Sequence, residues 1–448
     1  MRYAAHTVFL GFILKIQAIN GFKDILPEMV GRWQHIEQLT RDIFERFGFQ
    51  EIRMPILEKT ELFVRSIGEA TDVVEKEMYT FVDKAVTMRP EATASIMRAF
   101  IEHGLHVQQP VQRLYTIGPM FRHERPQKGR LRQFHQLDAE IIGAAEPRVD
   151  AELIAMGGML LDELGLTVSL ELNSLGCPVC LPPFKERLVT FLEQQYEALC
   201  DDCKRRTRTN PLRVLDCKKS SCRATVKDAP SLLAALCPDC DRHFIEVRTA
   251  LEELHIPFRI NRFMVRGLDY YTRTTFEFLT ADLGAQAAVG AGGRYDGLIE
   301  QLGGPPLSGI GFAMGMERLA LLMEQQDNCA IPAKGMDIFV AALGAIAPSG
   351  QLTHALRKQG AKAAIDYSGR SLKAQLKQAS RMNTSFTLIA GEDEWSRGEA
   401  ILRDMRTHEQ HPIALNGSPE EQARRLLGMI RAVAPVDRLT ANTQSSGC

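Results

Sequence analysis

Residues 121–134 read FRHERPQKGRLRQF, a basic loop between two segments in which apolar and polar residues alternate. The flanking segments, Val111–Met120 and Phe134–Ile142, are predicted to be the two strands of a hairpin. The five arginine and lysine residues of the loop suit a polyphosphate, because one guanidinium group can bind two phosphate oxygens. Phe134 offers a flat apolar face for a nucleotide base. A solvated charged hairpin is the competing interpretation when the loop is taken alone.

A second segment with an arginine begins at residue 309, where GIGFAMGMERL predicts a strand that leads into a helix. We expect the strand and helix over Ile310–Met323, with Arg318 near the start of the helix. The small residues before Arg318 allow a backbone to approach a ligand closely. The spacing GxGxxxG is not the dinucleotide fingerprint, and no Gly-Lys-Ser/Thr follows as a P-loop requires. Phosphates must therefore be held by another kind of site.

The neighbouring patterns predict an antiparallel α+β core. Apolar residues recur at helical spacing over Arg32–Phe47, and Gly48 suits the end of that helix. A short strand is predicted at Phe49–Met54, and another at Tyr271–Leu279, where aromatic and charged residues alternate. Strands joined by hairpins and long loops, without a regular βαβ alternation, argue against a doubly wound parallel sheet.

The length of 448 residues suggests several domains, and 45% hydrophobic with 24% charged residues is ordinary for a globular protein. We predict an N-terminal extension (1–14), a core domain (15–325), a helical Cys-rich insertion within it (175–258), a C-terminal α/β domain (335–433) and a disordered tail (434–448). The α/β domain is expected from alternating strands and helices at Asp337–Leu343, Gln351–Gln359, Ala363–Tyr367, Leu372–Met382 and Ser385–Ala390.

Charge and hydropathy bear on localisation and partners. The first 14 residues, MRYAAHTVFLGFIL, contain an apolar stretch, so a signal peptide is considered. That stretch is short and broken and lacks a small-x-small cleavage site, which favours an extension or a mis-assigned start. No stretch of the sequence approaches the roughly 18 apolar residues of a membrane-spanning helix, so we expect a cytoplasmic protein that does not associate with a membrane. The net charge of −1 does not exclude nucleic acid, because the basic residues are grouped.

Eight of the ten cysteines lie within residues 177–240. In a large chain without a convincing signal peptide, this grouping favours thiols or a metal over disulfides. Two CxxC pairs can complete a tetrahedral Zn²⁺ site with Zn–S distances of about 2.3 Å. The pairs with proline after the first cysteine are the preferred zinc ligands, with free thiols and a redox pair as alternatives: Cys177, Cys180, Cys237 and Cys240. The other cysteines here are Cys200, Cys203, Cys217 and Cys222.

Three segments resemble, in the correct order, the three motifs of class II aminoacyl-tRNA synthetases. The helix and strand ending at Pro55, with Glu58 after them, resemble motif 1, which builds a homodimer interface in that family. The loop with Arg122 and Glu124 resembles motif 2, and the segment with Arg318 resembles motif 3. The resemblance implies that Arg122 contacts the α-phosphate and the substrate carboxylate. It also implies that Arg318 holds the far end of a bent ATP, whose phosphates Mg²⁺ neutralises.

Two further segments, RGLDYYT at 266–272 and GAGGRYDGL at 290–298, resemble the signatures of the histidyl-tRNA synthetase family. This resemblance covers about Lys15–Val433 and implies L-histidine, ATP and tRNA(His) as substrates. It makes the core domain catalytic and the C-terminal domain anticodon-binding. It assigns Arg266 as a catalytic cation beside Arg122 and Arg318. It places histidine at Glu91, Ala92, Thr93, Arg122, Gln136, Glu140, Arg266, Tyr270, Tyr271 and Tyr295, and ATP at Arg122, Glu124, Phe134 and Arg318.

Elementary chemistry agrees with these roles. Two anions meet during adenylation, so the site needs fixed positive charge, whereas the ionised carboxylate nucleophile needs no base. A carboxylate and a phenol can bind both imidazole nitrogens and discriminate roughly 10⁴-fold against amino acids that lack them. Ala92 stands where the family has glycine; its methyl group is tolerated if the backbone there is right-handed.

The insertion also concentrates positive charge, at Lys204, Arg205, Arg206, Arg208, Arg213, Lys218, Lys219 and Arg223. Such a density suits a phosphate backbone, so we expect the insertion to touch the acceptor arm of the tRNA. The family does not generally need zinc, which keeps free cysteines open as an alternative. Two other functions fit parts of the pattern: a non-catalytic regulatory subunit of ATP phosphoribosyltransferase, which shares the fold, and a zinc-ribbon nucleic-acid-binding protein. Histidine-dependent ATP–pyrophosphate exchange separates the ligase from both.

Overall fold

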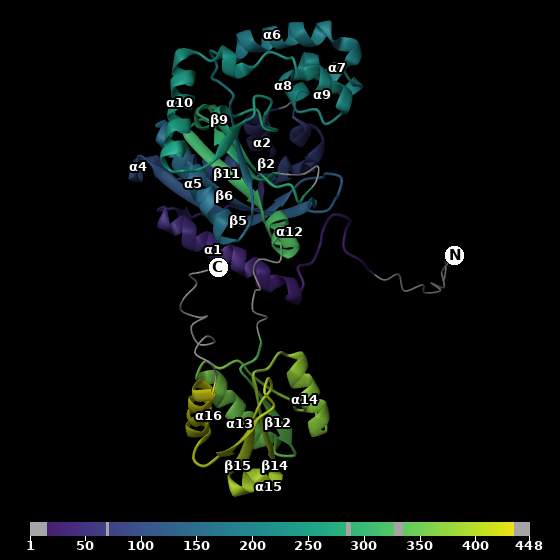
Figure 1. Ribbon diagram of the computed structural model, residues 1–448, viewed down its shortest axis with the longest axis vertical. Helices are drawn as coiled ribbons and strands as arrows, with labels where there is room; N and C mark the ends of the chain where they lie inside the picture. Colours follow the sequence, from purple (N-terminus) through teal and green to yellow (C-terminus); the bar gives the residue numbers. More distant parts are fainter. Residues whose placement is uncertain (1–15, 69–70, 284–287, 327–334, 434–448) are drawn as a thin grey trace, which may run out of the picture. The chain divides into compact units, whose positions relative to one another are not determined.

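The computed structural model describes residues 16–68, 71–283, 288–326 and 335–433 (Figure 1). The chain divides into two compact units, with the boundary between residues 330 and 331. The predicted extension and tail, residues 1–14 and 434–448, lie outside the described residues. Among the helices that are described, none is long and apolar enough to pass through a bilayer.

The first unit is built on an eight-stranded sheet with the order β1-β5-β6-β11-β10-β9-β7-β8. The inner strands pair antiparallel, whereas the short edge strands β1 and β8 pair parallel with their neighbours. The predicted antiparallel α+β core is therefore confirmed. The bounds are β1 Gln50–Glu51, β5 Gln112–Phe121, β6 Gln133–Ile142, β7 Ser169–Ser174, β8 Phe258–Ile260, β9 Thr272–Leu279, β10 Ala288–Arg294 and β11 Gly309–Gly315.

The two faces of this sheet have different partners, because successive side chains of a strand point to opposite faces. On β11 the ring of Phe312 lies 5.9 Å from the ring of Phe44 in helix α1 (Pro27–Arg46). Helix α1 also packs against α5 (Pro147–Glu163) and α12 (Met316–Gln326), and α5 packs on β11. The alternate residues of β11 line a pocket: Gly311, Ala313 and Gly315.

Short elements beside the sheet complete the wall of the pocket. A three-stranded sheet has the order β2-β4-β3, and helix α3 begins directly after residues Glu91 and Ala92. The bounds are β2 Leu57–Lys59, β3 Tyr79–Phe81, β4 Val86–Met88, α2 Thr60–Ile67, α3 Thr93–Glu102, α4 Leu105–Gln108 and α11 Leu298–Gln301, with a π-helix at Val73–Glu77 and a 3-10 helix at Val82–Lys84.

A helical segment lies between β7 and β8, as the sequence predicted for the insertion (Figure 1). It has a small core of its own, in which Phe184, Leu188 and Val214 are fully buried with several cysteines. Its last helix returns to the core domain and packs against α5. The bounds are α6 Leu181–Gln194, α7 Asp201–Thr209, α8 Leu212–Leu215, α9 Ser220–Val226 and α10 Pro238–Glu253, with 3-10 helices at Tyr196–Ala198 and Leu232–Ala235.

The second unit is a five-stranded sheet with the order β13-β12-β14-β15-β16, flanked by helices. The predicted alternation of strands and helices is found as far as β14, whereas α15, β15, β16 and α16 were not predicted. The bounds are β12 Ile338–Leu343, α13 Ile346–Lys358, β13 Ala363–Ile365, α14 Leu372–Arg381, β14 Phe386–Gly391, α15 Glu392–Arg397, β15 Glu399–Asp404, β16 Gln410–Ala414 and α16 Pro419–Val433.

Candidate active site

A pocket of about 350 Å³ opens on the face of the large sheet that carries Gly311 and Ala313. Strands β6, β10 and β11 contribute side chains to it, together with the basic loop after β5 and residues 265–271. Most of the predicted site residues line it: Glu91, Thr93, Arg122, Glu124, Phe134, Gln136, Arg266, Tyr270, Tyr271, Tyr295 and Arg318. Ala92 and Glu140 are buried behind this lining.

Arg122 follows β5 directly, at the start of the basic loop. Its Nε donates a hydrogen bond of 2.8 Å to the carbonyl oxygen of Pro90. Its guanidinium carbon lies 5.4 Å from the centre of the Phe134 ring, within cation–π range. Glu124 is almost fully buried and forms an ion pair with Arg130. The loop that the sequence offered as a phosphate site is therefore folded against the pocket, with its first arginine fixed.

Two further arginines reach the pocket from distant segments. Arg266 donates a hydrogen bond of 2.6 Å to Oε1 of Glu277 on β9 and lies 5.3 Å from the Tyr271 ring. Arg318, in the first turn of α12, donates through Nε to the carbonyl oxygen of Gly129 at 3.3 Å. Burial first, and then the nearby Arg130 cation, lower the pKa of Arg318, but a guanidinium group stays protonated in any protein. The pocket thus contains permanent positive charge from three directions.

Glu91 supplies a buried negative group. Its Oε1 accepts a hydrogen bond of 3.0 Å from the backbone N–H of Ala94, and its Oε2 has no hydrogen-bond partner among the described residues. Burial raises the pKa of this carboxyl group. The next residue, Ala92, has φ −99° and ψ −30°, so its methyl group causes no backbone strain. Glu91 is therefore fixed at one oxygen, and the other is available to a cationic ligand.

Glu140 links three elements behind the pocket. Its Oε1 accepts a 2.6 Å hydrogen bond from Thr93 Oγ1, and its Oε2 accepts a 2.5 Å hydrogen bond from the Tyr295 hydroxyl. Burial raises the pKa of Glu140 to about 8. The rings of Tyr270 and Tyr295 lie 5.9 Å apart, edge to face, and Tyr271 packs beside Tyr270. This network fixes the aromatic wall of the pocket.

The glycine-rich strand β11 has a steric purpose. A Cβ atom at Gly311 would lie 1.6 Å from Oε2 of Glu140 and 2.8 Å from the backbone oxygen of Ala139. Since β6 and β11 pair directly at this point, with Gly311 opposite Glu140, neither strand can move aside. Glycine at this position makes room for a buried carboxylate between two strands.

Several lining residues were not singled out from the sequence. Glu277 alternates with two buried phenylalanines on β9, so its direction was readable from the pattern. Asp138 lies on the same face of β6 as Gln136, and burial raises the pKa of its carboxyl group well above the usual range. Arg213 and Asp216 come from the insertion; Arg213 was expected to contact the tRNA, and no local signal indicated that either residue reaches the pocket.

Comparison with known proteins identifies this arrangement. A family model described as histidyl-tRNA synthetase matches residues 21–319, which include every pocket residue named above. The chain belongs to the histidyl-tRNA synthetase family. A model described as an anticodon binding domain matches residues 344–422, within the second unit.

Individual members of the histidyl-tRNA synthetase family are similar over nearly their whole length. The histidine–tRNA ligase of Desulfotalea psychrophila is 61% identical over 416 residues, which covers 91% of this chain and 97% of the relative. That of Geobacter metallireducens is 55% identical over 407 residues, with 90% and 98% covered. The crystal structure of apo Staphylococcus aureus histidyl-tRNA synthetase aligns with a TM-score of 0.76 at 35% identity, covering 91% of this chain and all of that one.

These similarities confirm the predicted class II synthetase fold and the prediction of an aminoacyl-tRNA ligase. They do not favour the regulatory-subunit alternative, because relatives that are 54% to 61% identical are histidine–tRNA ligases and match this chain over 97% or more of their length. The roles of individual residues stay predictions, which the pocket geometry supports.

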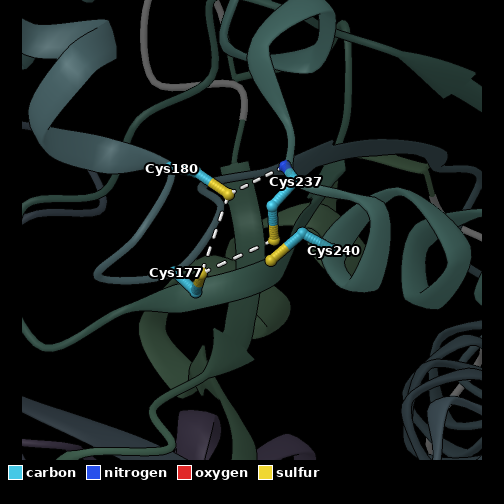
Figure 2. A group of neighbouring side chains, drawn as sticks. All are labelled: Cys177, Cys180, Cys237 and Cys240. Carbon is cyan, nitrogen blue, oxygen red and sulfur yellow. Dashed lines mark hydrogen bonds between the residues drawn. The ribbon is translucent and has the colours of Figure 1, made fainter.

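The eight cysteines that the structure describes form two groups. The first cluster comprises the four predicted zinc ligands, Cys177, Cys180, Cys237 and Cys240, whose sulfur atoms all lie within 4.8 Å of one another (Figure 2). The second cluster, which was not predicted as a site, comprises Cys200, Cys203, Cys217 and Cys222 and meets the same distance limit. All eight cysteines are free thiols.

Proposed function

We propose that the pocket activates L-histidine with ATP to histidyl-adenylate and then transfers the histidyl group to tRNA(His). Family membership establishes the protein as an aminoacyl-tRNA ligase, so the proposal concerns the work of each side chain. The observation that carries it is the convergence of Arg122, Arg266 and Arg318 on one pocket beside the buried carboxylate of Glu91.

In the first step a carboxylate oxygen of histidine attacks the α-phosphorus, and the bond to the bridging oxygen breaks as pyrophosphate leaves. Negative charge gathers on the α-phosphate, where preorganised cations lower the barrier most effectively. We assign Arg122 and Arg266 to this centre, and Arg318 to the departing pyrophosphate. Phe134 is assigned to the adenine ring, and Glu124 to a hydrogen bond from the adenine amino group. The ionised carboxylate needs no general base.

Histidine recognition is assigned to the acidic and aromatic side chains of the pocket. The unpartnered Oε2 of Glu91 suits the α-ammonium group, with Thr93 and Gln136 beside it. The imidazole is assigned to the tyrosine wall and Glu140, whose raised pKa keeps it protonated and uncharged near neutral pH in the empty pocket. A neutral network that exchanges hydrogen bonds with both ring nitrogens would reject amino acids with apolar side chains.

ATP brings Mg²⁺, a hard cation that takes oxygen ligands from phosphates and carboxylates. Class II synthetases use Mg²⁺ with ATP. Glu277 lines the pocket and supplies carboxylate oxygens of the right kind. When bound with ATP, the ion would neutralise phosphate charge, and Glu277 would help to hold it.

The other partners follow from the family. We assign residues 335–433 to anticodon binding, residues 15–325 to catalysis and residues 175–258 to an insertion that contacts the tRNA. The motif 1 helix and strand are assigned to a homodimer interface, and the protein to the cytoplasm. The match of an anticodon-binding model to residues 344–422 supports the first assignment.

A structural Zn²⁺ is proposed at the first cluster (Figure 2). The Cys177 sulfur lies 3.7 Å from that of Cys180 and 3.9 Å from that of Cys237. Four sulfurs at about 2.3 Å from one ion stand about 3.8 Å apart, so these separations fit a tetrahedral site. The backbone N–H of Cys237 donates to the Cys180 sulfur at 3.1 Å, which stabilises a thiolate ligand. The ion would join the beginning of the insertion to its last helix.

The proposed reaction is tested by ATP–pyrophosphate exchange with histidine and with other amino acids. We expect exchange that depends on histidine, and a KM for histidine raised about 100-fold in Glu91→Gln, since a buried charged partner is lost. Glu399→Gln, on an exposed side chain of the second unit, is the matched control and should leave the KM unchanged. Exchange that is absent, or that proceeds equally with other amino acids, would contradict the proposal.

A further inference from the structure

The second cluster is a complete set of metal ligands that the family resemblance does not assign. Its four sulfur atoms lie within 4.8 Å of one another. Cys203 and Cys222 are fully buried and Cys217 nearly so, whereas Cys200 is partly exposed. Cys200 and Cys203 stand at the start of α7, Cys217 follows α8, and Cys222 lies in α9. Three short helices therefore direct their thiols to one point.

The chemistry of this point favours a divalent metal. A tetrahedral zinc–thiolate site requires four sulfurs about 3.8 Å apart, and structural zinc sites take all four ligands from the protein. The backbone N–H of Cys200 donates a hydrogen bond of 3.2 Å to the Cys222 sulfur, which stabilises the charge of a thiolate ligand. The same kind of N–H to sulfur contact occurs between Cys237 and Cys180 in the first cluster.

The local fold also needs a cross-link. Helix α8 has four residues and α9 has seven, and helices of this length are not stable by themselves in water. Their buried apolar side chains are few, chiefly Val214, Leu215 and Val226. A small core of this kind is commonly completed by a structural metal, whose binding energy becomes folding energy.

The helices that the second cluster joins also reach the active site. Arg206 forms an ion pair of 3.1 Å with Asp72, and Asn210 Nδ2 donates a hydrogen bond of 3.2 Å to Asp269. Arg213, in α8, lines the active-site pocket. Arg213 lies between Cys203 and Cys217 in the sequence, so the segment that carries it is closed by the second cluster.

We propose that Cys200, Cys203, Cys217 and Cys222 bind a second Zn²⁺, and that this ion holds Arg213 in the pocket wall to bind a substrate phosphate. The role of Arg213 rests on the proposed function, whereas the metal site does not. The phosphate belongs either to ATP or to the terminal nucleotides of the tRNA, since both must enter the same pocket. In either case the guanidinium group supplies the charge-assisted hydrogen bonds.

The metal site is tested by native mass spectrometry of the full-length protein, together with replacement of zinc by Co²⁺ and its thiolate charge-transfer absorption. We expect two Zn²⁺ per chain in the wild type. Cys222→Ser should retain one ion at the first cluster, and Cys180→Ser should retain one at the second. Wild-type protein with one ion, retained in Cys222→Ser and lost in Cys180→Ser, overturns the proposal while leaving the first zinc site intact. The number of Zn²⁺ ions in the wild-type protein can be measured whether or not the cysteine variants fold.

The role of Arg213 is tested by separating two KM values. Arg213→Ala should raise about 10-fold either the KM for ATP in pyrophosphate exchange or the KM for tRNA in charging, which names the source of the phosphate. Arg187→Ala, an exposed arginine of α6 in the same insertion, is the control and should change neither. Unchanged KM values for both substrates in Arg213→Ala overturn this part of the inference, while histidine-dependent exchange would still support the proposed function.

Discussion

In the pocket, charged side chains stand on a wide sheet and are fixed by hydrogen bonds, as Glu140 is between Thr93 and Tyr295. The insertion has no sheet of its own among the described residues; short helices surround a small core, and two groups of thiols bring these helices together. The two regions are therefore stabilised differently: the pocket by hydrogen bonds between side chains on a sheet, and the insertion by its two groups of thiols. We expect the part of the pocket on the sheet to keep its shape without an ion, whereas the insertion, with Arg213 in the pocket wall, should depend on metal.

The largest expected effect is on the rate of pyrophosphate exchange, and it should occur without a change in bound metal. Arg266→Ala should lower the rate of pyrophosphate exchange about 10³-fold, because a preorganised cation at the α-phosphate is lost. The zinc content should not change, although the neighbouring Val265 belongs to the core of the insertion. Arg397→Ala, an exposed side chain in the second unit, is the control. A loss of zinc in Arg266→Ala would show that the two regions are not independent.

A second test targets the rigidity of the sheet. Gly311→Ala should destabilise the first unit by about 1–3 kcal/mol, because the new methyl group overlaps Glu140 and the backbone of Ala139. Gly158→Ala, in α5, has open space around the added carbon and should stabilise slightly, as alanine favours helices. Calorimetric melting temperatures measure both changes. Equal melting temperatures in the two variants would mean that the sheet relaxes where the structure shows no room.

A third test uses pH, since the carboxyl groups with raised pKa lie in the pocket. Burial holds the pKa of Glu140 at about 8, against 4.5 in the unfolded chain. Between these values the folded state binds the extra proton, so stability falls as pH rises, by up to about 1.4 kcal/mol per pH unit. Burial raises the pKa of Glu91 and Asp138 in the same direction. Between pH 5 and pH 8 the melting temperature should therefore decrease less steeply for Glu140→Gln than for wild type. Parallel decreases in the two proteins would refute the raised pKa of Glu140.

The smallest expected effect concerns the surface of the insertion. Arg205→Ala should reduce the salt dependence of tRNA charging by about one unit of log–log slope, because one phosphate contact is lost. Histidine-dependent exchange should be unaffected. Arg206 is already paired with Asp72, so Arg206→Ala should alter the fit of α7 as well as the charge. Charging and salt dependence that stay unaltered in both variants would mean that the insertion does not touch the tRNA.

Part of the sheet of the first unit could be predicted, most clearly β9, whose residues alternate, whereas β7, β8 and β10 were not predicted as strands. Phe276 and Phe278 on β9 are buried, and Glu277 between them lines the pocket. The last helix, α16, was missed although it has a start signal. Ser418 and Glu421 exchange hydrogen bonds with each other's backbone N–H groups, which is a capping box. The edge strand β16, which contains Pro412, has no such pattern.

Site residues could be predicted where they lie in a recognisable sequence motif. They could not be predicted where only the folding of distant segments brings them to the site. The structure brings Arg122, Arg266 and Arg318 to one pocket, although they were assigned from separate motifs. Arg213 could not be placed, because its position depends on how the insertion folds against the core domain. The second cluster was missed for a similar reason, since Cys217 and Cys222 are spaced unlike a zinc knuckle and meet the CxxC pair only across helices.

The short separation of 3.9 Å between the sulfur atoms of Cys177 and Cys237 has a consequence for engineering. The chain passes through almost the same place at Cys177 and at Cys237, so residues 178–236 form a cassette within the insertion, which carries Cys180, the second cluster and Arg213. A short glycine-serine bridge could span that gap, since closing a short loop costs little entropy. The cassette could then be excised, with the loss of both metal sites and of Arg213, or exchanged for that of a relative, without altering the length of any strand in the large sheet.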